Sequence, residues 1–176
     1  SLGINYVMII STNAGLWGYN IGDTIQFTCL KPYRIIVSGR IKHFISAFGE
    51  HVIGKEVECA LQEAMQDSMV SVNEFTVAPQ INPKEGQLPY HEWFIEFGHE
   101  PSNLEEFALK IDFAMRKQNA YYDDLIVGHV LRTLVITKVP KNGFQKYMKS
   151  IGKLGGKNKL PRLSNERKIA DLLTEI

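Results

Sequence analysis

Two charged side chains in the first quarter of the chain have the chemistry to hold a polar ligand. Asp23 closes the tight stretch YNIGD (residues 19–23), and Arg40 follows the glycine that opens GRIKHFISAFGE (residues 39–50). A carboxylate can accept hydrogen bonds from two donors at once, and a planar guanidinium can donate two parallel bonds to a phosphate or carboxylate. By residue type alone, a turn aspartate after Gly22 and a solvated arginine at a strand end are equally ordinary interpretations.

Positive charge is concentrated near the C-terminus. The net charge is only +1, from 20 Lys and Arg against 19 Asp and Glu, yet residues 138–168 hold ten of the basic residues and a single acid, Glu166. Such a block favours an anionic partner, either nucleic acid or a small phosphorylated ligand. Its stretch GKLGGKNKLPRLSNERK (residues 152–168) offers Lys153, Lys157 and Lys159. The glycines allow this loop to fold over a ligand, and Pro161 stiffens the chain after Lys159.

Motifs for other common chemistries are incomplete. The stretch GKLGGKN (residues 152–158) is one residue short of a phosphate-binding P-loop and lacks its magnesium-binding hydroxyl. The five histidines include no HExxH pair, and no GxSxG or Cys–His nucleophile arrangement is present. Cys29 and Cys59 follow no metal-ligand or disulfide pattern, so we interpret both as small buried side chains. The sequence therefore predicts no metal site.

Aromatic residues among the lysines raise the alternative of an RNA-binding surface. Phe144 and Tyr147 are the residues concerned, and they share one helical face with Met148 and Ile151. A shared apolar face favours a core stripe with lysines on the exposed side of the helix. A non-catalytic binding domain, with a basic surface for nucleic acid or a protein partner, is therefore the second interpretation.

The elements that must position these residues alternate between strand and helix. Apolar residues spaced i, i+3, i+4, i+7 predict a helix over residues 55–68. β-type runs predict strands over residues 4–10, 24–30, 33–38, 70–78, 90–97 and 133–139, the fourth and fifth forming a hairpin with a long connection. Further helices are expected over residues 121–131 and 145–151.

Two serines are predicted to begin helices. Ser102 with Glu105 has the spacing of a capping box for a helix that runs to about Asn119, and Ser164 is expected to cap a last helix through Leu173. The resulting fold class is α+β, with a small mixed β-sheet packed with helices.

Composition and length bound the possibilities further. At 176 residues, with 44% hydrophobic and 22% charged residues, the chain can bury a core and is not expected to be disordered. No apolar run has the roughly 18 residues needed to cross a bilayer, so we expect a cytoplasmic protein without membrane contact. The dense β-type run at residues 4–10 begins almost at Ser1. We therefore expect a piece of a longer protein, with Ser1 left by cloning.

Several motifs, taken in order, resemble one enzyme family. Residues 39–52, read as G-R-x-K-x-x-I-S-x-x-G-E-x-V, resemble the hinge segment of acyl-adenylate-forming enzymes (the ANL superfamily), usually G-R-x-D-x-x-I-K-x-x-G, and YNIGD resembles the Y-x-x-G-D element of the same superfamily. NAGLWGYNIGD (residues 13–23), KHFISAFGE (42–50), YDD (122–124) and KLPRLSN (159–165) are similar to motifs of the auxin-responsive Gretchen Hagen family of acyl-acid amido synthetases. The resemblance covers essentially the whole chain.

The resemblance implies a role for each candidate residue. Asp23, with Tyr19 in the same element, is expected to bind the ribose of ATP, and Arg40 the ribose or phosphate region. Lys42 stands at the hinge position, where the superfamily more often has Asp. Lys159 is expected to be the catalytic lysine that swings in and lies between two anions. Lys157 and Lys153 are less favoured substitutes, and the family typically has Gln near Lys157.

The resemblance also implies the domain organisation and the reaction. Residues 1–40 correspond to the C-terminal end of the large adenylating domain, and residues 41–176 to the mobile C-terminal domain. In the full-length enzyme, ATP and Mg²⁺ adenylate a carboxylic acid, and an amine, expected to be an amino acid, then attacks the acyl-adenylate. The missing N-terminal domain is the expected partner of this part, which alone should be inactive.

Overall fold

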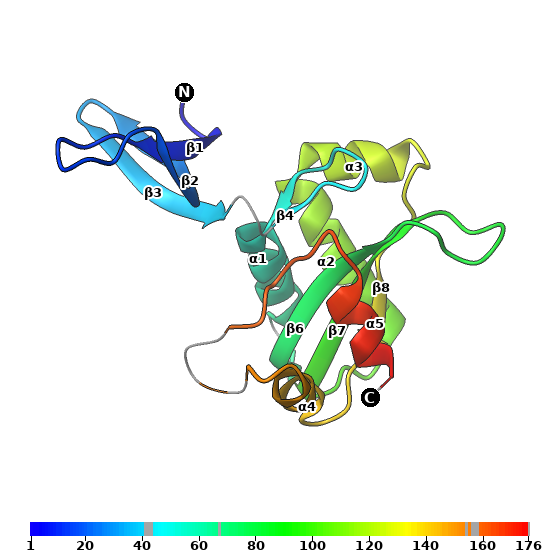
Figure 1. The fold of residues 1–176 in the computed structure, drawn as a ribbon. Helices are drawn as coiled ribbons and strands as arrows, with labels where there is room; N and C mark the ends of the chain where they lie inside the picture. The colour runs from blue at the N-terminus through cyan, green and yellow to red at the C-terminus, as the bar shows by residue number, and fades with distance from the viewer. Residues whose placement is uncertain (41–43, 67, 154, 156–158, 176) are drawn as a thin grey trace.

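The computed structural model describes residues 1–40, 44–66, 68–153, 155 and 159–175, and for Arg40 it describes the backbone alone. Three sheets and five helices follow one another along these described residues. The small three-stranded sheet at the N-terminus stands apart from the rest of the molecule (Figure 1). The predicted α+β class and the small mixed sheet packed with helices are confirmed.

The N-terminal sheet is antiparallel, in the order β1 (Asn5–Ile10), β2 (Tyr19–Leu30) and β3 (Tyr33–Arg40). Alternating exposure along β1 shows that one face is partly covered and the other faces solvent. Ile25 is buried, but many apolar side chains of this sheet and its loops are exposed, Trp17 to 91%. The three strands are those expected from sequence, with β2 beginning five residues earlier.

The larger sheet is mixed and forms the centre of the C-terminal part. β6 (Ser71–Gln80) and β7 (Tyr90–His99) form the expected antiparallel hairpin, and β8 (Val135–Lys138) joins β7 in parallel. The loop between β6 and β7 projects away from the body (Figure 1). Trp93 and Ile95 face one side of the sheet and Phe94 the other, because side chains alternate along a strand.

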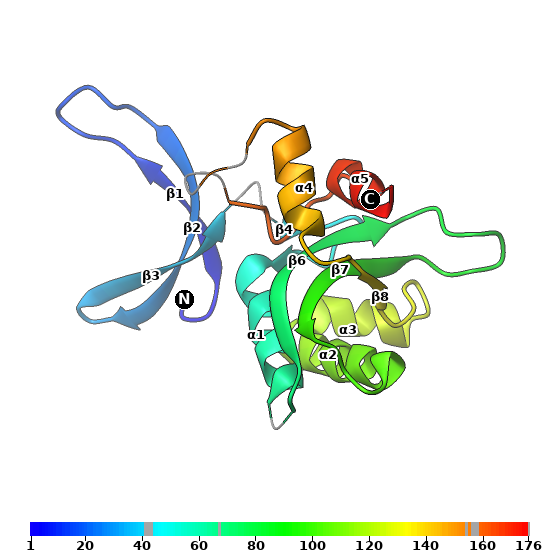
Figure 2. The ribbon, with the colours of Figure 1, turned by 90° about the horizontal axis from the view of Figure 1, so that it is seen from below.

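Helices cover both faces of this sheet (Figure 2). The first core packs the apolar stripe of α1, predicted from its helical spacing, against α2, α3 and one sheet face. The second, smaller core packs α4 and α5 against the opposite face, around Phe94. The helices are α1 (Gly54–Met65), α2 (Leu104–Gln118), α3 (Ala120–Val127), α4 (Gly143–Ser150) and α5 (Lys168–Thr174).

Both serine caps predicted from the sequence are wrong. The cap of α2 is Asn103, whose side-chain oxygen accepts the amides of Glu105 and Glu106 at 3.0 and 3.2 Å. Ser164 does not begin α5, because its hydroxyl bonds the backbone of Glu166 and the helix starts at Lys168. At α2 a neighbouring residue of a good capping type lies closer to the first turn, whereas the N-cap position of α5 is Arg167, whose side chain makes no cap hydrogen bond.

The predicted core stripe of α4 is largely confirmed. Phe144 and Tyr147 are buried, and Met148 packs against them, whereas Ile151 is 38% exposed. The lysines of the helix point to solvent. Among the described residues, no helix has the length and apolar character needed to cross a bilayer.

Candidate functional site

The ladder between β2 and β3 brings two of the predicted ligand-binding residues to one place. Asp23 and Arg40 are Cα partners in this antiparallel pair, and Thr24 is the partner of Gly39. Asp23 is half-buried, whereas Tyr19, at the start of β2, is 53% exposed. The positive φ of Gly22, 82°, explains why a glycine precedes Asp23. The side chain of Arg40 and the predicted hinge residue Lys42 lie outside the described residues.

The chain after the predicted hinge is attached to the C-terminal part. β4 (Phe44–Ile45) and β5 (Val52–Ile53) form a short antiparallel pair that leads directly into α1. The amide of Ser46 donates to the side-chain oxygen of Asn165 at 2.9 Å, across 119 positions of sequence. This bond joins the hinge-proximal chain to the segment that follows Lys159.

Residues 160–164, here called the strap, lie along the free edge of β6. The amide of Val77 donates to the carbonyl of Arg162 at 2.9 Å, and the amide of Ser164 donates to the carbonyl of Val77 at 3.0 Å. These bonds form a parallel bridge between Val77 and Leu163, whose side chain is buried. The hydroxyl of Thr76 also donates to the Pro161 carbonyl at 2.8 Å. The strap is therefore fixed to the sheet, one residue after Lys159.

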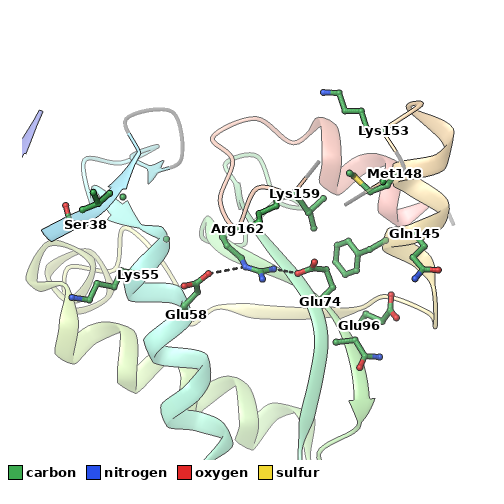
Figure 3. Close-up of a pocket in the computed structure, with 17 residues that line it drawn as sticks. Ser38, Lys55, Glu58, Glu74, Glu96, Gln145, Met148, Lys153, Lys159 and Arg162 are labelled. Atoms are coloured by element: carbon green, nitrogen blue, oxygen red, sulfur yellow. Dashed lines mark hydrogen bonds and ion pairs between the residues drawn. The ribbon is translucent and has the colours of Figure 1, made fainter. Parts of the chain in front are cut away.

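Lys159 is exposed and lines an open groove of about 1220 Å³ (Figure 3). The groove is bounded by the end of β3 at Ser38 and Gly39, the first turn of α1 at Lys55, the edge of β6 and helix α4. Lys153, one of the substitutes considered, also lines it, whereas Lys157 lies outside the described residues. The structure thus places the favoured lysine in a concave surface that begins next to the Asp23–Arg40 rung.

Arg162 crosses one wall of this groove and was missed by sequence reasoning. Its Nε donates to Glu58 on α1 at 3.2 Å, and its Nη1 pairs with Glu74 on β6. Nη1 also donates to the carbonyl of Phe75 at 3.2 Å, and the guanidinium lies over the Phe75 ring. An arginine directly after a proline carries no sequence signal for such partners, since they lie 87 to 104 positions away.

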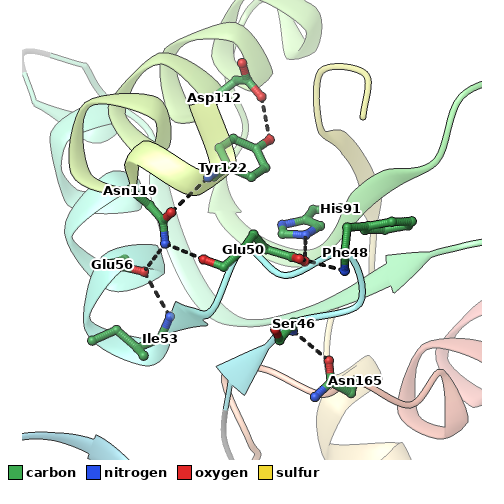
Figure 4. A network of polar contacts seen from close by, with 10 residues as sticks. All are labelled: Ser46, Phe48, Glu50, Ile53, Glu56, His91, Asp112, Asn119, Tyr122 and Asn165. Carbon is green, nitrogen blue, oxygen red and sulfur yellow. Dashed lines mark hydrogen bonds and ion pairs between the residues drawn. The ribbon is translucent and has the colours of Figure 1, made fainter. Parts of the chain in front are cut away.

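A buried hydrogen bond between His91 and Glu50 anchors the loop that follows the predicted hinge (Figure 4). Nε2 of His91, on β7, lies 2.9 Å from Oε1 of Glu50, and both side chains are at most 1% exposed. Burial alone would raise the pKa of the Glu50 carboxyl, but hydrogen bonds from His91 and the backbone, including the Phe48 amide at 2.8 Å, lower it below 4.5. Glu50 is therefore ionised, and His91 Nε2 carries the donated hydrogen.

Asn119, between the end of α2 and the start of α3, extends this network. Its amide nitrogen donates to the carbonyl of Glu50 at 3.0 Å and to Oε2 of Glu56 at 3.2 Å, while its oxygen caps α3 at the Tyr122 amide. The hydroxyl of Tyr122 donates to Asp112 at 2.7 Å, and burial raises its pKa well above 10.0. These hydrogen bonds fix the loop around Glu50, which follows the predicted hinge, against the first core.

No group of three or more His, Cys, Asp or Glu side chains within the described part of the chain is arranged to hold a metal ion. The groove instead presents lysine and arginine beside the carboxylates of Glu58, Glu74 and Glu96. All three carboxylates have partners in the fold, since Glu58 and Glu74 pair with Arg162 and Glu96 accepts the amide of Asn142 at the start of α4. Lys159, which takes part in no ion pair among the described residues, is the cation of the groove suited to attract an anion.

Two family models match the sequence. The model of the GH3 family central domain matches residues 1–40, and that of the GH3 family C-terminal domain matches residues 55–168. No curated protein matches the sequence.

Two solved structures share the fold. One, "GH3.15 acyl acid amido synthetase", has a TM-score of 0.75 at 17% identity, with 99% of this chain and 34% of the other covered. The second, "AtGH3.15 acyl acid amido synthetase in complex with 2,4-DB", has a TM-score of 0.72 at 16% identity and covers 99% and 33%. The chain thus spans about a third of the length of these structures. Since the C-terminal domain model alone matches well over half of the residues, the chain belongs to the GH3 family.

Proposed function

We propose that this chain is the C-terminal part of an ATP-dependent acyl-acid amido synthetase. Family membership supports this class of enzyme, as do two structures of the same fold that are described as acyl acid amido synthetases. We assign residues 1–40 to the end of a large adenylating domain and residues 41–176 to a mobile C-terminal domain. The exposed apolar side chains of the N-terminal sheet, such as Val7 and Ile35, support contact with the rest of that large domain.

The observation that carries the proposal is the position of Lys159 in the groove that starts at the end of β3. In the first half-reaction, a carboxylate oxygen of the acid attacks the α-phosphorus of ATP and pyrophosphate leaves. Both reacting groups are anionic and repel each other. A preorganised cation between them stabilises the charge that develops in the transition state. In the second half-reaction, an amine attacks the acyl carbon, AMP leaves, and an amide forms.

The nucleotide is assigned to the rung that joins β2 and β3. The carboxylate of Asp23 can accept both ribose hydroxyls, and Tyr19 opens the same strand as a half-exposed aromatic ring. Arg40 is assigned to the phosphate or ribose region. Mg²⁺ is assigned to accompany ATP, where the phosphates would supply part of its oxygen ligands.

The pivot between the two domains is assigned to Lys42. Its neighbours support this position. Arg40 ends a strand of the N-terminal sheet, and Phe44 begins the short pair that is fixed to the C-terminal part. A few residues between two rigid bodies can absorb the φ/ψ change of a rotation.

Pyrophosphate release tests the proposal directly. The full-length protein, supplied with ATP, Mg²⁺ and a panel of carboxylic acids, should release pyrophosphate with at least one acid and form an amide when amino acids are added. This chain alone should do neither. Failure of the full-length protein with every acid, under conditions in which it is folded, would remove the assignment.

One observation favours a second candidate, a basic binding domain. Lys141, Lys146 and Lys149 lie exposed on and beside α4. However, Phe144 and Tyr147 are buried and are not available to stack on bases. Titration with single-stranded RNA at two salt concentrations separates the candidates, since tight and steeply salt-dependent binding is expected only of a nucleic-acid interface.

A further inference from the structure

The position of Lys159 depends on the chain that follows it. Its side chain is exposed, and among the described residues it takes part in no ion pair. A free lysine side chain has four flexible bonds and cannot fix its own ammonium group. The strap attached to β6 provides that fixation from the backbone, because Pro161 and Arg162 are held to Thr76 and Val77 by hydrogen bonds.

Among the described residues, Arg162 makes the only side-chain hydrogen bond from the strap to α1. Its guanidinium joins Glu58 in α1 to Glu74 in β6, and it stacks on the ring of Phe75 with 4.6 Å between the guanidinium carbon and the ring centroid. Figure 3 shows it between the two carboxylates, next to Lys159. The side chain is 35% exposed, so it lies at the surface of the groove. The planar guanidinium bonds both carboxylates, and this fixes its orientation.

We propose that Arg162 is a positioning residue, which acts through Glu58 and Glu74 to set where Lys159 lies over the groove. The inference rests on the proposed function of Lys159. In this arrangement Arg162 is neutralised by two carboxylates and is not available to hold a substrate phosphate. Removing it should leave nucleotide binding intact and displace the lysine. A displacement of about 1 Å at a reacting centre can lower the rate by about 100-fold.

The test uses pyrophosphate release by the full-length protein with varied ATP. Arg162→Ala should lower kcat by about 10- to 100-fold with the KM for ATP within about twofold of the parent. Arg162→Lys keeps the charge but not the fork, and should recover part of the rate. Glu58→Gln removes one anchor from a half-exposed position and should lower kcat in the same direction, less strongly. Arg116→Ala is the matched control, since Arg116 is 36% exposed in an ion pair with Asp123 on α3.

A double variant separates positioning from a general loss of stability. If Arg162 acts through Lys159, Arg162→Ala adds little to the loss already caused by Lys159→Ala. Hydrogen exchange of the amides of Val77 and Ser164 should also become faster in Arg162→Ala and stay unchanged in Arg116→Ala.

Three results would overturn the proposal. An unchanged kcat for Arg162→Ala shows that the lysine does not need it. A raised KM for ATP with unchanged kcat shows that Arg162 binds the nucleotide itself. Fully additive losses show that it acts elsewhere. Failure of the proposed function has a different signature. In that case the parent releases no pyrophosphate, or Lys159→Ala leaves the release unchanged.

Discussion

Asp23 and Arg40 lie opposite each other on one rung of the β2–β3 ladder, so the expected ribose-binding corner and the first arginine of the hinge motif share a single structural unit. They are separated by 17 positions in sequence but by one strand spacing in the fold. If the nucleotide binds at this rung as proposed, a rotation that begins just after Arg40 would pivot next to it. Lys159 lines the same groove as Gly39, the residue before Arg40.

Asp23→Ala should weaken nucleotide use in the full-length protein. Because hydrogen bonds to a charged group are worth about 1.5–3 kcal/mol, the KM for ATP should rise by about 10- to 100-fold. The measurement is pyrophosphate release with ATP, 2′-deoxy-ATP and 3′-deoxy-ATP. The parent should discriminate against both deoxynucleotides, and the variant should treat all three alike. Equal discrimination in parent and variant would place the ribose elsewhere.

Lys159→Ala should slow adenylation by about 100- to 1,000-fold while leaving the fold intact, because an exposed side chain contributes little to stability and a preorganised charge contributes much to the transition state. Single-turnover pyrophosphate release and the midpoint of thermal unfolding are the two readouts. Lys153 lines the same groove, so Lys153→Ala tests the alternative lysine. If Lys153→Ala shows the larger loss, the catalytic assignment moves to Lys153.

Lys149→Ala is the control for both lysine variants. Lys149 lies exposed near the end of α4 and does not line the groove. It should show the parent rate, since a solvated lysine outside the groove changes only the screened surface charge.

Much of the fold was predictable because local patterns decide it. The apolar spacing of α1 and the turn residues between β6 and β7 each specify one element without reference to distant residues. Helix caps were less predictable. Ser102 and Asn103 are both good caps, and the backbone conformation of the following turn decides that Asn103 accepts the amides.

The polar contacts of the site could not be predicted from local sequence patterns. The partners of Glu50 and Arg162 lie 41 and 88 positions away, and they meet only after β6, β7 and the strap have assembled. From the sequence, Glu50 stands only in a motif, and His91 is one of five histidines without an HExxH pair, so nothing pairs the two. Lys159 and Asp23 could be proposed from the sequence because they stand in motifs, and a motif can be recognised without knowing the contacts of the fold.

His91→Leu should destabilise the fold strongly at neutral pH. It leaves the buried, ionised Glu50 without its side-chain partner, and breaking a buried pair in this way costs about 3–5 kcal/mol. Urea unfolding at pH 7 measures the loss. Because the pKa of Glu50 is lowered in the fold, the stability it provides is present above pH 4.5 and is lost as the pH falls through the lower, folded value. The cost of His91→Leu should therefore shrink in acid, and an equal cost at pH 7 and pH 3 would contradict the assignment.

Glu56→Gln should have the opposite pH dependence. Burial raises the pKa of Glu56 above 4.5, against hydrogen bonds from Ile53 and Asn119 that lower it. A raised pKa means that the stability linked to Glu56 is present below pH 4.5 and is lost as the pH rises through the folded value. Glutamine is uncharged, and its oxygen can still accept both hydrogen bonds. Relative to the parent, the variant should gain stability between pH 4 and pH 8, measured by urea unfolding at both values. A variant that loses stability relative to the parent over that interval would show that the ionised carboxylate is favoured in the fold.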